Sequence, residues 1–163
     1  MADLTLISGQ LADLLRGNEA FHLTTFLGVQ VPRELQLPNS AHHVPQSWAH
    51  YRETIAAWRF HIGLAPMRPT RFNQARSATR LLDHAAFGAA GLYSDTLPFS
   101  PLIERGVDGM LVGREAASWT TAIRQLAAEP ALRRKLASEG QGTAVRIGEL
   151  SRVRQFWRGL LGF

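Results

Sequence analysis

The chain has 163 residues, of which 45% are apolar and 19% charged, and its formal net charge is +5. Its length suits one domain, and its composition excludes a wholly disordered chain and a collagen-like fibre. The absence of cysteine excludes disulfides, thiolate metal sites and a cysteine nucleophile. No apolar run reaches the roughly 18 residues that span a bilayer. An acidic residue, Asp3, stands where a secretory signal would be basic. We therefore expect a cytoplasmic protein.

Basic residues outnumber acidic ones, 18 to 13, and Lys135 is the only lysine among them. This balance favours an anionic partner, which is a nucleic acid, a phosphorylated small molecule or an acidic membrane surface. A GC-rich genome also produces an arginine-rich protein, so composition does not choose the partner. Because the chain carries no recognised nucleic-acid-binding motif, we expect no nucleic-acid partner.

The first part of the chain is predicted to contain two helices around a strand and a loop. Apolar residues recur at helical spacing, then give way to an aromatic and β-branched run and two prolines. The predicted helix, strand, loop and second helix cover residues 4–16, 21–27, 29–46 and 47–58. Three aromatic residues of the second helix share one face, which predicts that Trp48, Tyr51 and Trp58 pack in the core.

The apolar run at 60–66 ends at a proline and is typical of a buried parallel strand. A polar loop follows, then a helix that Gly88 ends as a C-cap. Ser118 is predicted to cap a later helix. After the strand at 60–66, the predicted elements are a loop at 67–74, a helix at 75–87, strands at 89–93 and 109–112, and helices at 118–128 and 130–139. This alternation of short strands and longer helices predicts an α/β domain with a parallel sheet.

The loop and helix after the 60–66 strand form the strongest candidate site. Ligands of open α/β sheets bind beyond the carboxyl ends of the strands. A helix that starts there, near Ala75, would offer free N–H groups to a phosphate. Arg68, Arg71 and Arg76 would add charge-assisted contacts, and Ser77 a hydroxyl. The alternative is an ordinary solvated loop that contains arginines.

Asp83 lies two turns into the predicted helix, roughly on the face of Arg76 and Ser77. A carboxylate at this place would accept hydrogen bonds from the two hydroxyls of a ribose. The alternative is a salt bridge to Arg80, three residues earlier on the same helix.

The runs His61-Ile-Gly-Leu-Ala-Pro and Arg71-Phe-Asn-Gln-Ala-Arg-Ser, continued to Gly88, resemble a known family. They are similar to the donor-binding half of retaining nucleotide-sugar glycosyltransferases of group 1, which have the GT-B fold. The segments 93–99, 103–112, 119–126 and 129–136 resemble the later blocks of that family in the same order. The resemblance therefore covers about residues 20–140.

The resemblance implies a fold and an activity. It implies a three-layer, Rossmann-like donor-binding domain over 1–146, which is half of a GT-B fold. The pattern of the residues themselves predicts a basic amphipathic helix over 147–163 after this domain. The activity would be transfer of a sugar from a nucleoside diphosphate sugar to an acceptor, with no further cofactor and no metal.

The resemblance also assigns residues to parts of that donor. The family's ribose-binding glutamate falls on Asp83, and the loop of Ser94, Asp95 and Thr96 would line the sugar side. The positions that would face the diphosphate are Arg71, Asn73, Arg76, Ser77 and Arg80. No catalytic residue is assigned, because the acceptor side of such enzymes comes from a second domain.

Three departures from the family pattern affect what is expected. Ala75 replaces the family's first glutamate, and Gly88-Ala-Ala-Gly91 replaces a glycine–x–proline turn. The family's first strand and its acceptor-binding domain have no counterpart in this sequence. A missing strand would leave a sheet edge uncovered. We therefore expect an acceptor-domain partner or a homo-oligomer. The alternative function is a non-catalytic nucleotide-binding or protein-interaction module.

The tail combines basic with aromatic residues, namely Arg152, Arg154 and Arg158 with Phe156 and Trp157. One interpretation is a helix packed on the domain. The other is peripheral contact with the anionic inner face of a membrane. The adjacent His42 and His43, with other scattered histidines, lack the spacing of metal ligands, so we expect no metal site.

Overall fold

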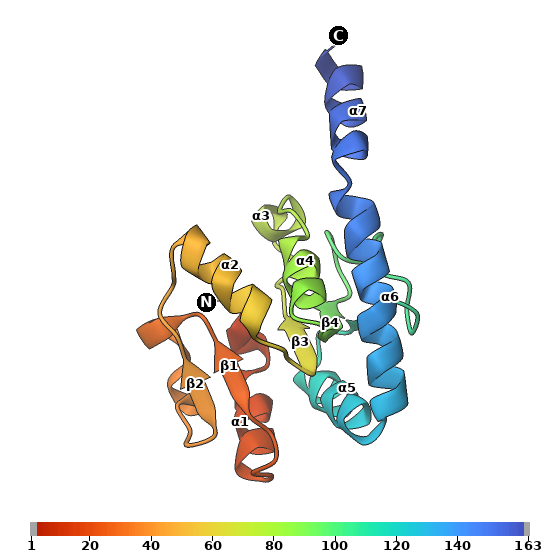
Figure 1. Cartoon of the computed structure of the whole chain (residues 1–163). Coiled ribbons are helices and arrows are strands. Elements are labelled where there is room, and N and C mark those ends of the chain that lie inside the picture. Colours follow the sequence, from red (N-terminus) through yellow and green to blue (C-terminus); the bar gives the residue numbers. More distant parts are fainter. Residues whose placement is uncertain (1–2, 162–163) are drawn as a thin grey trace.

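The computed structural model describes residues 3–161, apart from the side chains of Ile55, Leu150, Arg152, Val153, Phe156 and Leu161, and has a mixed α/β fold (Figure 1). Its strands form two sheets, and every strand pair is parallel. One sheet pairs β1 (Leu23–Thr25) with β2 (Ser40–His42). The other has the order β3-β4-β5, from β3 (Ile62–Ala65), β4 (Ala90–Ser94) and β5 (Met110–Val112). The expected α/β class with parallel strands is confirmed.

The helices of the described part alternate with these strands. A short 3₁₀ helix, η1 (Leu4–Leu6), precedes α1, and two more, η2 (Gly28–Gln30) and η3 (Arg33–Leu35), separate β1 from β2. The α-helices are α1 (Ser8–Arg16), α2 (Trp48–Ala57), α3 (Arg71–Gln74), α4 (Thr79–Ala86), α5 (Ala116–Ala128), α6 (Pro130–Gly148) and α7 (Leu150–Leu161).

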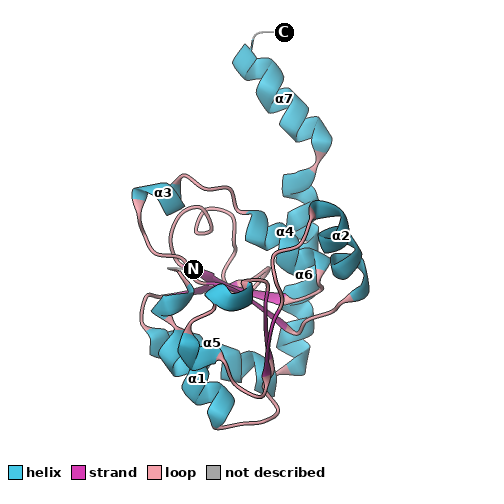
Figure 2. Cartoon of the chain, turned by 90° about the vertical axis from the view of Figure 1, so that its left-hand side faces the viewer, coloured by secondary structure: helices cyan, strands magenta, loops and turns pink. Residues whose placement is uncertain are grey.

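Helices cover both faces of the sheet that contains β4. All five residues of β4 are buried, because successive side chains point to opposite faces of a strand. Ala90 and Leu92 pack in a cluster with apolar residues of α1 and α5. Tyr93 points the other way, into a cluster with Leu81 of α4 and with Phe99. Figure 2 shows the strands between these groups of helices.

The two sheets share a core but no strand ladder. Leu23 of β1 and both Ile62 and Leu64 of β3 pack against the cluster that α1 helps to form. Within residues 3–161, however, β1 pairs only with β2, and β3 only with β4. Each therefore keeps one edge without a neighbouring strand among these residues.

The chain between β3 and β4 differs from the prediction. A single helix was expected to begin near Ala75, but α3 ends at Gln74 and α4 begins only at Thr79. Thr70 caps the one-turn helix α3, and the Ala75 N–H bonds back to Arg71 and Phe72. No helix therefore starts at Ala75. Gly88 does end α4, with φ of +67°, as predicted.

Two predictions for the later helices are wrong. Ser118 does not cap α5, which begins two residues earlier, after Glu115. The helix expected at 130–139 continues to Gly148. Its extension is held by tertiary contacts: the Thr143 hydroxyl donates to Asp108 at 2.7 Å, and Gly140 lies directly against the Asp108 carbonyl.

The aromatic residues of α2 do not form one buried face. Trp48 is 69% exposed, so its predicted place in the core is wrong. Tyr51 and Trp58 instead join a partly exposed aromatic cluster with Phe26 and Phe87. α2 lies at the margin of the fold, in contact with α4, which leaves the start of the helix in solvent.

The C-terminal helix α7 projects from the end of α6 away from the rest of the fold (Figures 1 and 2). Its described side chains are exposed, including Trp157 and Leu160. The described side chains of α7 therefore do not support the interpretation that the tail packs on the domain. Arg152 and Phe156 belong to the same prediction, but their side chains lie outside the described residues.

Candidate functional site

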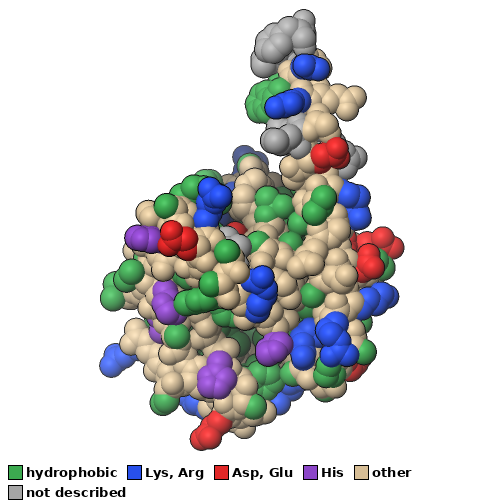
Figure 3. All heavy atoms as spheres, viewed as in Figure 1, with side chains coloured by type: hydrophobic (Ala, Val, Ile, Leu, Met, Phe, Trp, Pro, Cys, Tyr) green, Lys and Arg blue, Asp and Glu red, His purple; other side chains and the backbone are tan. Residues whose placement is uncertain are grey.

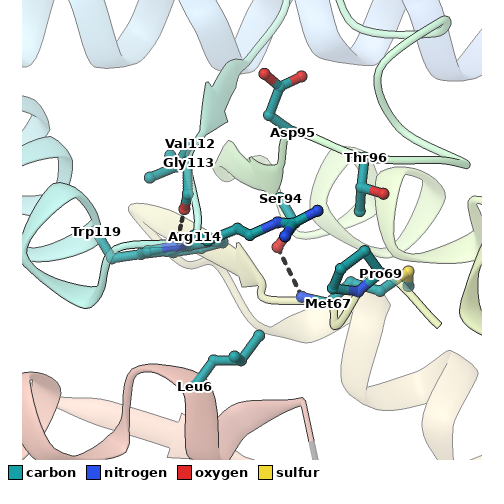
Figure 4. A pocket seen from close by; sticks show the side chains of 10 residues that line it. All are labelled: Leu6, Met67, Pro69, Ser94, Asp95, Thr96, Val112, Gly113, Arg114 and Trp119. Atoms are coloured by element: carbon teal, nitrogen blue, oxygen red, sulfur yellow. Dashed lines mark hydrogen bonds between the residues drawn. The ribbon is translucent and has the colours of Figure 1, made fainter.

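The candidate site lies at the carboxyl ends of β3, β4 and β5, where polar loops follow three neighbouring parallel strands. A cavity of about 40 Å³ opens there, lined by Met67 from the loop after β3, by Ser94 at the end of β4 and by Trp119 of α5 (Figure 4). Leu6 of η1 closes it from the opposite side, and the Arg114 side chain runs across it. A water needs about 10–15 Å³ of such volume, so the cavity accommodates a few waters but no nucleotide.

The loop expected on the sugar side is held by internal hydrogen bonds. The Ser94 hydroxyl is buried and accepts the Met67 N–H at 2.7 Å, which ties the loop after β3 to the end of β4. Asp95 forms a close ion pair with Arg105 and turns its carboxylate away from the cavity (Figure 4). Thr96 is half-buried and lines the cavity. Of the three residues expected on the sugar side, Ser94 and Thr96 are therefore the ones whose side chains a ligand in the cavity would contact.

Beside this cavity, three groups converge on the carboxylate of Asp3. The main-chain N–H of Arg68 donates to Asp3 Oδ1 at 2.9 Å, and Asn73 Nδ2 donates to the same oxygen at 2.8 Å. The Arg76 guanidinium lies 3.7 Å from Asp3 Oδ2. We call these three groups, the Arg68 N–H, the Asn73 amide and the Arg76 guanidinium, the oxyanion cradle.

Local structure fixes the central residue of the oxyanion cradle. Thr70 caps α3 by accepting the Asn73 N–H at 3.2 Å, and Asn73 Nδ2 also donates to the Arg68 carbonyl at 2.9 Å. Asn73 is buried, so its amide is held in one place. Arg76 is exposed, and its guanidinium lies 6.0 Å from the ring centroid of Phe72, itself an exposed aromatic residue. The oxyanion cradle therefore combines a fixed amide with an arginine that solvent reaches.

The structure brings together two of the five residues expected at a diphosphate, Asn73 and Arg76. Arg71 begins α3 and Ser77 lies between α3 and α4; both are exposed. Arg80 instead forms an ion pair with Asp83, with Arg80 Nη1 at 2.9 Å from Asp83 Oδ2. The salt bridge that was the alternative for Asp83 is thus present.

Asp83, the residue expected at the ribose, has a second partner on α2. Burial, together with the nearby Asp83 carboxylate, raises the pKa of the Tyr51 phenol. Tyr51 and Arg80 therefore both engage Asp83. A ribose would have to share or replace these contacts.

The sequence analysis did not identify Asp3 as a site residue. Asp3 and Asn73 are separated by 70 positions, and no local pattern connects a carboxylate near the start of a chain to a distant amide. No signal in the sequence therefore indicated that Asp3 would meet Asn73.

His84 lies beneath this region but takes no part in the oxyanion cradle. It is buried on α4, its ring stacks obliquely on Tyr93 at 5.2 Å, and Nδ1 has no hydrogen-bond partner. Burial, with a smaller contribution from the Arg80 charge, lowers the pKa of His84 to about 3. A neutral, enclosed imidazole of this kind serves packing.

The two adjacent histidines, His42 at the end of β2 and His43 directly after it, have structural roles. His42 Nε2 lies 3.0 Å from the Leu35 carbonyl, which only accepts, so Nε2 carries the proton and Nδ1 accepts from the Thr25 hydroxyl. His43 packs edge-on against Trp58. Across the described residues, no group of three or more histidine and acidic side chains is placed to hold a metal ion. Histidines are scattered over the face in Figure 3.

A second surface with a distinct character is α7. Arg154, Trp157 and Arg158 are exposed along it, and Figure 3 shows basic side chains on the projecting helix. No helix that the structure describes combines the length and the apolar character needed to cross a bilayer.

Comparison with protein-family models gives no match, and comparison with curated proteins gives none either.

Proposed function

We propose that the chain is the donor-binding half of a glycosyltransferase, which transfers a sugar from a nucleoside diphosphate sugar, and that the oxyanion cradle binds the diphosphate. One observation carries this proposal. Asn73 and Arg76, which the family resemblance assigns to the diphosphate, converge on a single carboxylate together with the Arg68 N–H. A phosphoryl oxygen needs the same donors as a carboxylate oxygen, namely N–H groups and positive charge.

The proposed mechanism is electrostatic. When the bond between the sugar and the diphosphate breaks, negative charge develops on the leaving phosphoryl oxygens. N–H donors and guanidinium groups that are already in place stabilise this charge. In this proposal the Arg68 N–H and the Asn73 amide hold one phosphoryl oxygen and Arg76 neutralises its charge. Arg71 and Ser77, exposed nearby, approach the second phosphate.

The remaining parts of the donor are assigned to neighbouring residues. Asp83 binds the ribose hydroxyls after exchanging its contacts with Arg80 and Tyr51. Ser94 and Thr96 face the sugar, and Asp95 joins them after exchanging its contact with Arg105. Because the cavity is only about 40 Å³, the segment that contains Asp3 and Leu6 must move before a nucleotide sugar can occupy it.

The acceptor side of the reaction is proposed to come from a partner. The edges of β1 and β3 that no strand of the described residues covers are where an acceptor-domain partner, or a second copy of the chain, would add main-chain hydrogen bonds. We place the assembly in the cytoplasm, with α7 resting on the anionic inner face of a membrane through its arginines and Trp157.

A non-catalytic nucleotide-binding or protein-interaction module is the second candidate. It is favoured by the ion pair of Arg80 with Asp83, which engages the proposed ribose ligand, and by the closed cavity. The two candidates differ in turnover rather than in binding. Release of free sugar or glycoside from a bound nucleotide sugar distinguishes the enzyme from the module.

The test is calorimetric titration of the chain with UDP, GDP and their sugar conjugates. A hydrogen bond to a charged group contributes about 1.5–3 kcal/mol, so we expect Asn73→Ala and Arg76→Ala each to weaken binding at least about tenfold. Arg124→Ala is the matched control, because Arg124 is an exposed arginine on α5. Absence of nucleotide binding by the folded chain would exclude the donor function.

A further inference from the structure

We propose that the carboxylate of Asp3 is an internal competitor for the oxyanion cradle, so that a phosphoryl ligand binds only by displacing the N-terminal segment of residues 3–6. This inference rests on the phosphoryl-binding part of the proposed function. It adds how access to that site is controlled.

The first argument is the chemistry of the contact. Asp3 Oδ1 accepts two hydrogen bonds, from the Arg68 N–H at 2.9 Å and from Asn73 Nδ2 at 2.8 Å. Asp3 Oδ2 faces the Arg76 guanidinium at 3.7 Å. A carboxylate that receives N–H donors and a guanidinium occupies the place that one phosphoryl group would take. Asp3 and an external phosphoryl group therefore exclude each other.

The second argument is that the same segment also closes the cavity. Arg68 Nη2 donates to the Thr5 hydroxyl at 2.9 Å, two residues beyond Asp3. Leu6, the last residue of η1, lines the cavity opposite Ser94 (Figure 4). Asp3, Thr5 and Leu6 therefore attach one short segment to the oxyanion cradle, to the loop after β3 and to the cavity. Displacing Asp3 frees the oxyanion cradle and loosens the contact that closes the cavity.

The segment that must move is short and lies on the surface of the core. It is a single 3₁₀ turn, with internal hydrogen bonds from the Leu6 N–H to the Asp3 carbonyl and from the Ile7 N–H to the Leu4 carbonyl. None of the side chains of η1 is fully buried, although Leu4 and Leu6 pack against the core cluster to which Ile7 and Leu11 belong. Detachment up to Ile7 therefore exposes two partly buried leucines but leaves the buried residues of the core in place.

Competition raises the apparent dissociation constant by the reciprocal of the fraction of molecules in which the oxyanion cradle is free. Two charge-assisted hydrogen bonds keep that fraction small, and we expect the free state to be about a tenth of the population or less. Removing the carboxylate should therefore tighten phosphoryl binding about tenfold.

The experiment is calorimetric titration of the full chain with inorganic pyrophosphate, UDP and GDP. We expect pyrophosphate to bind Asp3→Ala about tenfold tighter than the unchanged chain, and Asp3→Asn to lie between them, since Asn keeps an oxygen acceptor but loses the charge. The control is Asp13→Asn. Asp13 is an exposed acid on α1, so its replacement changes the net charge equally without touching the oxyanion cradle.

A second measurement uses the unchanged chain, so that it does not depend on how a variant folds. Hydrogen exchange at the Leu6 and Ile7 amides should accelerate when pyrophosphate is added, while the Leu11 amide, which bonds to the Ile7 carbonyl within α1, should not change. Pyrophosphate binding that leaves the Leu6 and Ile7 amides unchanged would overturn the proposal.

The outcomes separate this inference from the proposed function. If UDP or GDP binds the unchanged chain, Asp3→Asn and Asp3→Ala equally well, the competition is refuted and the donor function stands. If pyrophosphate binding tightens in Asp3→Ala but no nucleotide binds better than pyrophosphate, the competition stands and the donor function is refuted. If a folded Asp3→Ala chain binds no pyrophosphate, the oxyanion cradle is not a phosphoryl site and the inference fails.

Discussion

Replacement of Gly63 by alanine would place a methyl group inside the ring of His84. A Cβ atom at residue 63 would lie 2.4 Å from His84 Cγ, 2.5 Å from Cδ2 and 2.7 Å from Nδ1. Ordinary contacts between carbon atoms are about 3.5–4.0 Å, so the overlap exceeds 1 Å. The ring has nowhere to move, because Tyr93 packs against it with 5.2 Å between ring centroids.

Overpacking of a buried site costs about 1–3 kcal/mol, and an overlap with a rigid ring belongs at the upper end. We therefore expect Gly63→Ala to lower the free energy of unfolding by about 3 kcal/mol. For a chain of this length that corresponds to a fall in Tm of roughly 6–12 °C. Urea unfolding followed by circular dichroism measures the change. Gly9→Ala is the control, since a Cβ at Gly9 meets no atom within 4 Å.

A double-mutant cycle identifies the cause. In a His84→Ala background the ring is gone, so the added methyl group at residue 63 enters free space. Residues in contact show coupling energies of about 0.5–3 kcal/mol, and we expect Gly63→Ala and His84→Ala to couple by at least about 1 kcal/mol. If the two effects add within about 0.5 kcal/mol, the clash is not with His84 and the reasoning is refuted.

Three further predictions concern stability and membrane contact. Thr143→Val keeps the side-chain shape but removes the donor to the buried Asp108 carboxylate; we expect a loss of about 2 kcal/mol, measured by urea unfolding, and a loss under about 0.5 kcal/mol would contradict it. The pKa of His84 is lowered to about 3 in the folded chain. When the pH is lowered, His84 therefore becomes protonated in the unfolded chain at a higher pH than in the folded chain. The free energy of unfolding should decrease as the pH is lowered below about 6.5, by up to about 1.4 kcal/mol per pH unit, and it should decrease less steeply in His84→Phe. Vesicles containing phosphatidylglycerol should co-sediment with the chain, and replacing Arg154 and Arg158 by Glu should abolish this, because each nearby arginine contributes about 1 kcal/mol; equal binding to neutral phosphatidylcholine would refute it.

Much of the fold follows from local patterns in the sequence. The apolar run that ends at Pro66 contains β3, and Gly88, two residues beyond the end of α4, takes the positive φ that ends the helix. Such signals depend on residues that are adjacent in the chain, so they can be recognised without knowing the fold.

The extent of α6 depends on a contact that no local pattern reveals. Beyond residue 139 the helix contains Gly140 and Gly142 in close succession, which argue for a helix end. In the fold, Gly140 is instead the place where the helix approaches the Asp108 carbonyl, and Thr143 bonds to the Asp108 side chain. The glycine permits close packing, and tertiary contacts outweigh the helix propensity.

The candidate site could be predicted in part. The rule that ligands bind beyond the carboxyl ends of parallel strands indicated the region of Asn73 and Arg76, and these two residues do converge. The pairing of Arg80 with Asp83 is a local i, i+3 contact that the sequence also offered as an alternative. Asp3 could not be found this way, because its contact depends on how two distant segments meet.

The most direct test of the account follows the side-chain amide of Asn73 by NMR while UDP or GDP is added to the chain. The account predicts that the Asn73 Nδ2 proton resonances shift in a saturable way with one nucleotide, because a phosphoryl oxygen replaces the Asp3 carboxylate as their acceptor. Nucleotide binding that leaves these resonances unmoved, or no binding at all by the folded chain, would contradict the assignment of this region as the diphosphate site.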